Sequence, residues 1–64
     1  MIELQTGVII SYRDKLMKLT SMNRTCRFVG CDEHGVMNNE IMLCPIELVD
    51  KLIKYGLITI VSKP

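Results

Sequence analysis

Hydrophobic and polar residues alternate along residues 8–29, and two polar interruptions divide this stretch into three segments. The first interruption is Arg13-Asp14 and the second is residues 21–24. Alternation with a period of two is typical of half-buried strands, so this stretch predicts three antiparallel strands joined by turns. Arg13-Asp14 is not a favoured two-residue turn, because both central residues of a type I′ turn need positive φ. A bulged turn or a longer strand is the alternative there.

These turns imply a register for each pair of strands. A two-residue first turn places Ile10 opposite Met17, and a four-residue second loop places Leu19 opposite Cys26 and Met17 opposite Phe28. One face of the sheet then carries the core, because side chains two apart share a face. The predicted core residues of these strands are Val8, Ile10, Met17, Leu19, Cys26 and Phe28. The opposite face mixes Ile9, Leu16 and Val29 with polar residues, which indicates that another surface covers it.

Residues 45–56 have the pattern of an amphipathic helix. Its apolar stripe consists of Ile46, Leu48, Val49, Leu52 and Ile53. Pro45 suits the first helical position, where a missing N–H costs nothing, and Gly56 suits a left-handed C-terminal cap. Glu47 in the first turn and Lys54 in the last match the helix dipole. Residues 57–62 then alternate again and predict a closing strand.

The segment between the third strand and the helix has no clear pattern. Residues 32–35 and Asn38-Asn39 are competing turns, and either can lead into a strand at residues 40–44. The elements together predict an α+β fold, with a small antiparallel sheet of four to five strands, one helix and a closing strand that can return beside the first. A small barrel with an inserted helix is the alternative. With 64 residues and 7.3 kDa, the chain forms a single domain, residues 1–64, with a thin core.

One cluster of metal-ligand residue types stands out. Its members are Cys26, Cys31, His34 and Cys44. Thiolate and imidazole are the ligands that zinc prefers, and a metal is a common supplement to a thin core. The spacing is not that of a paired zinc module, however, and alternation turns Cys26 and Cys31 to opposite faces. We therefore expect packing thiols and no cofactor, with a zinc-stabilised mini-domain as an alternative.

Charge is unevenly distributed although the net charge is only +1. The basic residues of segment 13–27 are Arg13, Lys15, Lys18, Arg24 and Arg27, against Asp14 alone. Residues 28–50 hold five acidic residues and no basic one. A basic strand face can follow a phosphate backbone, so a nucleic-acid-binding module is a second alternative. The balanced total makes it less favoured, because little long-range attraction remains.

The leading hypothesis is a small interaction protein that binds a larger protein, modulates or inhibits it, and associates with itself into a homo-oligomer such as a homodimer. The predicted partner-binding residues are Ile9, Leu16 and Val29 of the mixed face, and Met22 and Met37 in or near turns. Flexible thioethers serve adaptable binding surfaces. No catalytic constellation, phosphate-binding loop or dinucleotide motif is visible, so we do not expect an enzyme.

The cysteine count bears on the compartment. Three cysteines are an odd number, which does not suit a disulfide-stapled secreted protein. Residues 1–5 lack the basic and apolar regions of a signal peptide, and no apolar run approaches the roughly 20 residues that cross a bilayer. We therefore expect a cytoplasmic protein with reduced thiols and no membrane partner.

Overall fold

The structure is a computed structural model that describes residues 4–64. The expectation about a signal peptide rests partly on residues 1–3, which lie outside this range. The strands are β1 (Ile9–Tyr12), β2 (Lys15–Met22), β3 (Thr25–Cys31), β4 (Met37–Pro45) and β5 (Ile58–Ser62), and the helix is α1 (Ile46–Lys54). No helix in this part of the chain is long and apolar enough to cross a membrane.

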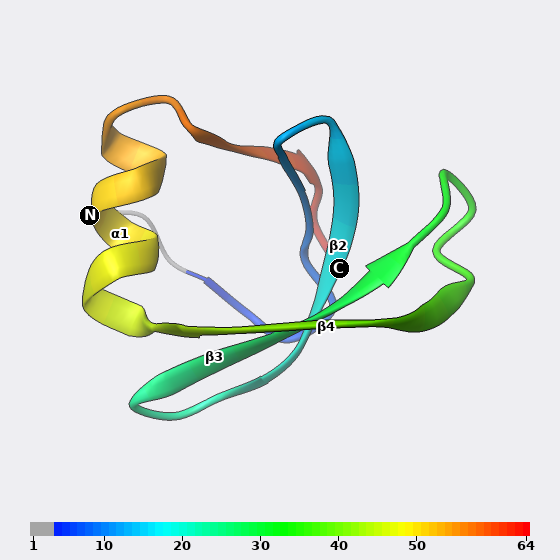
Figure 1. Cartoon of the computed structure of the whole chain (residues 1–64), viewed down its shortest axis with the longest axis horizontal. Helices are drawn as coiled ribbons and strands as arrows, with labels where there is room; N and C mark the ends of the chain where they lie inside the picture. The colour runs from blue at the N-terminus through cyan, green and yellow to red at the C-terminus, as the bar shows by residue number, and fades with distance from the viewer. Residues whose placement is uncertain (1–3) are drawn as a thin grey trace.

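The five strands form one antiparallel sheet in the order β4-β3-β2-β1-β5. The α+β fold is therefore confirmed, as is the return of the last strand beside the first. The sheet curls, with α1 at one end and the tip of the β3–β4 hairpin at the other (Figure 1). The helix joins the two edge strands and packs against β3, β4 and β5. It thereby covers part of the inner face of the curled sheet.

The turn between β1 and β2 has two residues, and the predicted pairing of Ile10 with Met17 is confirmed. Arg13 and Asp14 have φ of 53° and 63°, so both adopt the left-handed conformation of a type I′ turn. The Arg13 guanidinium carbon lies 5.4 Å from the centroid of the Tyr12 ring, within the range of a cation–π contact. This unfavoured dipeptide thus makes the tight turn, and the bulged alternative is wrong.

The predicted register of β2 against β3 is wrong by two residues. Leu19 lies opposite Phe28 rather than Cys26, and Met17 lies opposite Gly30. The strand continues to Met22, with a bulge after Leu19, so that only two residues remain for the turn. Because side chains alternate with a period of two, a shift of two residues keeps every side chain on its predicted face.

The turn at residues 32–35 is confirmed, whereas the competing turn at Asn38-Asn39 is wrong because both residues lie in β4. The carboxylate of Asp32 decides between them. Its Oδ1 accepts hydrogen bonds from the backbone N–H groups of His34 and Val36, each at 2.9 Å. These bonds close the turn early, so β4 begins at Met37 instead of residue 40.

The helix is shorter at both ends than the predicted range. Pro45 is its N-cap rather than its first helical residue, with an extended backbone (φ −56°, ψ 141°), because it is also the last residue of β4. At the other end, Gly56 has a φ of 78°, which confirms the left-handed cap. Its N–H donates to the Ile53 carbonyl at 3.0 Å, and the Leu57 N–H donates to the Leu52 carbonyl at 2.8 Å. These are the two bonds of a Schellman motif.

The core lies between the inner face of the sheet and α1. Its buried cluster contains Val8, Ile10, Met17, Leu19, Cys26, Phe28, Cys44, Val49 and Ile58. All six predicted sheet residues are thus buried. The helical stripe is narrower than predicted: Val49 is buried and Leu52 and Ile53 pack against the cluster, but Ile46 and Leu48 are exposed.

Candidate functional site

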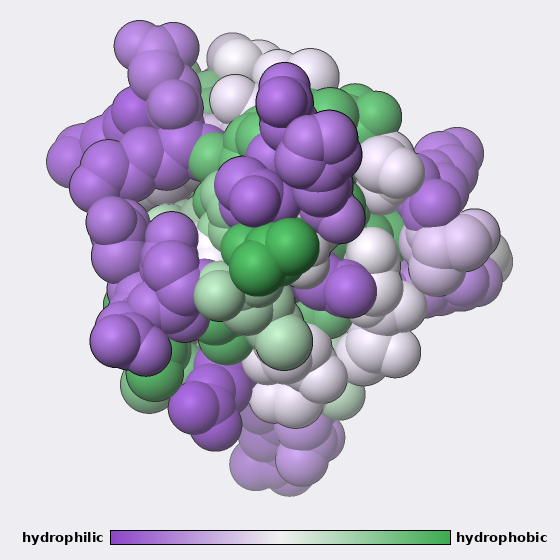
Figure 2. All heavy atoms as spheres, turned by 90° about the vertical axis from the view of Figure 1, so that its right-hand side faces the viewer, coloured by the Kyte–Doolittle hydropathy of each residue, from purple (hydrophilic) through white to green (hydrophobic). Residues whose placement is uncertain are grey.

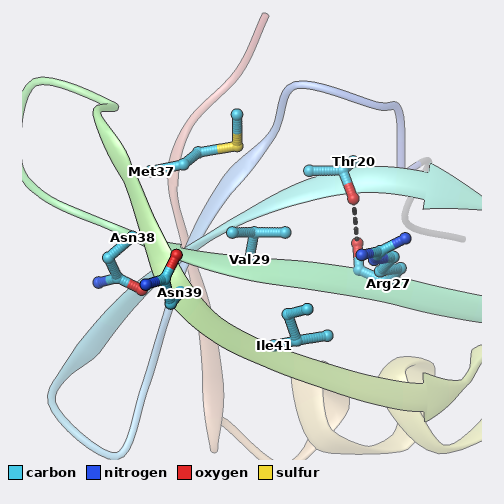
Figure 3. Close-up of a pocket in the computed structure, with 7 residues that line it drawn as sticks. All are labelled: Thr20, Arg27, Val29, Met37, Asn38, Asn39 and Ile41. Carbon is cyan, nitrogen blue, oxygen red and sulfur yellow. Dashed lines mark hydrogen bonds between the residues drawn. The ribbon is translucent and has the colours of Figure 1, made fainter.

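A shallow groove of about 400 Å³ lies on the outer face of the sheet, the face opposite the core. Its lining comes from three neighbouring strands and consists of Thr20 of β2, Arg27 and Val29 of β3, and Met37, Asn38, Asn39 and Ile41 of β4 (Figure 3). These residues share the groove because β2, β3 and β4 are adjacent in the sheet. We call it the outer groove.

The floor of the outer groove is apolar. Val29 and Ile41 are direct cross-strand partners, and their side chains lie side by side (Figure 3). Val29 is half-buried, whereas Ile41 and Met37 are 55% and 53% exposed. Large side chains on an outer sheet face are more often polar, so this exposure marks a surface suited to contact.

Polar groups stand at the two ends of this floor. Arg27 lies at one end, and Asn38 and Asn39 lie at the other (Figure 3). Asn38 Oδ1 accepts a hydrogen bond from the Glu40 backbone N–H at 2.7 Å, and Thr20 Oγ1 donates to the Arg27 carbonyl at 3.2 Å. The groove lining holds no acid–base pair and no thiol.

The structure brings two of the five predicted partner-binding residues into this groove, Val29 and Met37. Ile9 and Leu16 are half-buried. A Cβ atom placed on Gly35 would lie 3.8 Å from Ile9 Cδ1, so the β3–β4 turn covers part of the mixed face. Met22 ends β2, 37% exposed, and takes no part in the groove.

The tip of the β3–β4 hairpin carries further exposed apolar side chains. Val36 is 65% exposed and is followed directly by Met37. Figure 2 looks onto this end of the molecule and shows a small hydrophobic area surrounded by hydrophilic side chains. An apolar centre with a polar border is the usual anatomy of a protein contact surface.

The predicted basic residues do not form one track. The set is Arg13, Lys15, Lys18, Arg24 and Arg27. The first two lie at one end of β2, and Arg24 lies in the turn at its other end. Lys15 Nζ is 3.2 Å from Glu40 Oε2, so its charge is partly compensated. Two of the basic residues in the described part of the chain lie beside Val29 of the outer face. Lys18 of β2 is its cross-strand partner, and Arg27 precedes it by two residues in β3.

The predicted zinc ligands are also spread apart. Cys26 and Cys44 are cross-strand partners in the core, whereas His34 lies in the exposed turn with Nε2 3.5 Å from Glu33 Oε1. Residues 4–64 contain no group of three or more His, Cys, Asp or Glu side chains placed to hold a metal. A zinc site at Cys26, Cys31, His34 and Cys44 stays a prediction that this geometry does not support.

Burial raises the pKa of all three thiols. For Cys26 the neighbouring Cys44 adds to the rise in pKa. For Cys31 the Asp32 carboxylate raises the pKa further, while Lys18 opposes it. A raised pKa keeps these thiols protonated, and the thiolate is the nucleophilic form of cysteine.

No protein-family model matches the chain, and neither a curated protein nor a solved structure is similar enough to count as a match.

Sequence reasoning missed four members of the outer groove, which are Thr20, Asn38, Asn39 and Ile41. Ile41 and Leu43 lie within a predicted strand, but the inward Met42 and Cys44 are apolar as well. Without a polar alternation, the pattern cannot tell which face is exposed. Asn38 and Asn39 were missed because their sequence is typical of a turn.

Proposed function

We propose that this protein is a small interaction protein whose outer groove binds a larger protein and thereby modulates or inhibits it, and that it also associates with itself. The observation that carries the proposal is the exposed apolar floor of the groove. Met37 and Ile41 are each more than half exposed beside Val29, and Arg27 stands at the end of the floor. Contiguous apolar exposure bordered by polar groups is typical of interaction sites.

The groove favours a partner of particular chemistry. An apolar side chain of the partner would lie on Val29 and Ile41, and Met37 could adapt its shape to it. An acidic group beside that side chain would reach the Arg27 guanidinium, which forms strong bidentate bonds with carboxylates. We infer binding rather than catalysis, because the groove offers orientation and contact area but no reacting group.

The test is affinity capture with tagged protein in an extract of the organism that makes it. We expect Met37→Lys and Arg27→Glu each to lose the captured partner, since one removes apolar contact and the other reverses the charge. Leu57→Lys is the matched control, because Leu57 is apolar, 57% exposed and outside the groove lining. Circular dichroism verifies that each variant is folded.

The proposal fails if every protein captured by the wild type is also captured by Met37→Lys and Arg27→Glu. It fails equally if Leu57→Lys loses the partner together with the groove variants, because the contact would then lie elsewhere.

A further inference from the structure

From Ile41 to Leu43, the free edge of β4 carries none of the features by which edge strands avoid pairing. β4 is nine residues long and, among residues 4–64, pairs only with β3. Its one charged residue is Glu40, whose carboxylate is engaged by Lys15 of the same chain at 3.2 Å. Edge strands usually carry lysines, prolines or bulges against pairing. The register irregularity of this hairpin lies before Ile41, so the strand is regular from there to Pro45.

The hydrogen-bond pattern of the hairpin shows which backbone groups point to the free edge. The Ile46 N–H donates to the Arg24 carbonyl at 3.0 Å. Along an antiparallel pair, hydrogen-bonded positions alternate with positions whose N–H and C=O point away from the partner. Pro45 is the next position and points away, which agrees with its missing N–H. The same orientation recurs every second residue, so Leu43 and Ile41 also point their N–H and C=O groups away from β3.

This edge is complementary to itself. When two copies of β4 run antiparallel with Met42 opposite Met42, Ile41 of each copy faces Leu43 of the other. Each such pair exchanges two N–H···O=C bonds, giving about four in total. The proline does not interfere, because Pro45 lies beyond these pairs.

The side chains favour the same arrangement. Ile41 and Leu43 are 55% and 67% exposed, and in this register they lie beside each other across the two chains. No like charges meet, since no residue from Ile41 to Pro45 is charged. Met42, half-buried at the rim of the core, would meet its own copy on the inner face.

We infer that the free edge of β4 is occupied by β4 of a second copy of this chain, in a two-fold dimer centred on Met42. The inference rests on the self-association in the proposed function and specifies its site. β5, the other edge, is less suited. Its pairing with β1 is irregular at Ile9/Ile10, and Lys63 and Pro64 follow it directly. A two-fold contact also closes on itself, whereas β4 pairing with β5 would propagate.

Native mass spectrometry of untagged protein tests the dimer. We expect wild-type protein at twice the chain mass of 7.3 kDa. Leu43→Lys should be a folded monomer, with the dimer dissociation constant raised at least about tenfold, because a lysine enters each of the two symmetric contacts. Val61→Lys is the matched control and should remain dimeric, because Val61 is 54% exposed on the other edge strand.

A second variant tests the register. Residues opposite each other at a non-hydrogen-bonded position have Cα atoms about 4.5 Å apart, which a disulfide can span. Met42→Cys should therefore form a covalent dimer with oxidised glutathione, which accepts the two electrons and is reduced to two thiols. Val61→Cys, with the same three native cysteines, should not form one.

The inference is overturned if wild-type protein is monomeric at concentrations up to the millimolar range, or if Leu43→Lys is as dimeric as the wild type. Either result leaves partner capture by the outer groove intact, because Leu43 does not line that groove. Conversely, loss of the captured partner in Met37→Lys without loss of the dimer distinguishes the groove from the dimer contact, which have Ile41 in common.

Discussion

The Lys15 ammonium and the Glu40 carboxylate meet at 3.2 Å although β3 separates their strands. Neighbouring strands are about 4.8 Å apart, so this ion pair reaches across two strand spacings. Gly30 of β3 provides the space. A Cβ atom at this position would lie 3.0 Å from Glu40 Cβ and 2.6 Å from Asn38 Oδ1. The glycine is therefore required by the close approach of Asn38 and Glu40 rather than by its backbone angles.

Gly30→Ala should destabilise the protein more than removal of the ion pair itself. The new methyl group forces Asn38 and Glu40 to move, and overpacking of this kind costs about 1–3 kcal/mol. Lys15→Ala should cost less than about 1 kcal/mol, because the two side chains are 62% and 53% exposed and solvent screens the pair. Urea denaturation at one fixed protein concentration measures both. Equal losses would mean that the ion pair, and not the packing, fixes this end of the sheet.

The turn at Arg13-Asp14 offers a stabilising substitution. Both residues have positive φ, which costs a non-glycine residue roughly 1–2 kcal/mol. Asp14→Gly should therefore raise the free energy of unfolding by about 1 kcal/mol, whereas the control Asp14→Ala should not. Thermal denaturation of the two variants decides the point. If Asp14→Gly does not raise the thermal stability of the protein, the turn is not of type I′.

Gly56 ends the helix in a conformation that branched residues resist. Its φ is 78°, and a Cβ atom there would meet nothing within 4 Å, so backbone strain alone decides the effect. Gly56→Val should lower the free energy of unfolding by about 1–2 kcal/mol. Gly56→Asn is the matched control and should cost clearly less, because asparagine tolerates this region. A neutral Gly56→Val in the same denaturation experiment would contradict the Schellman cap.

The β3–β4 turn should loosen in acid. The pKa of Asp32 is held below its usual range chiefly by the hydrogen bond from the Val36 N–H, and further by that from the His34 N–H. A carboxyl group whose pKa is lowered by folding stabilises the folded state at pH values above its unfolded pKa of about 3.9. This stabilisation is lost as the pH falls through the pKa of the group in the folded state. Amide exchange at Val36 should therefore accelerate below about pH 4 relative to residues in β1. Asp32→Ala should show fast exchange at every pH, and an unchanged Val36 rate in that variant would contradict the turn.

The order of elements and the core could be predicted because they rest on local patterns. Val8, Ile10, Met17 and Leu19 recur with a period of two, and Gly56 follows a helical stripe, so each signal is contained in a few residues. A two-residue error in the register at Phe28 left the core unchanged, since a shift of two preserves the face.

The candidate site was predictable only in part, for a physical reason. Val29 and Met37 were identified as exposed or mixed-face residues, but their meeting with Thr20 depends on the bulge in β2 and the early start of β4. The early start of β4 depends on the hydrogen bonds to the Asp32 carboxylate, which leave no periodic pattern in the sequence. The free edge of β4 is likewise a property of the strand order, which local patterns do not encode.

Site-specific photo-crosslinking tests directly whether the outer groove binds a larger protein. Benzoylphenylalanine is placed at Thr20 in the groove and, as a matched control, at Thr59, an exposed threonine of β5. We predict one discrete adduct heavier than a dimer from position 20, lost when Arg27→Glu is added, and none from position 59. No adduct from position 20, or the same adduct from both positions, would contradict the account.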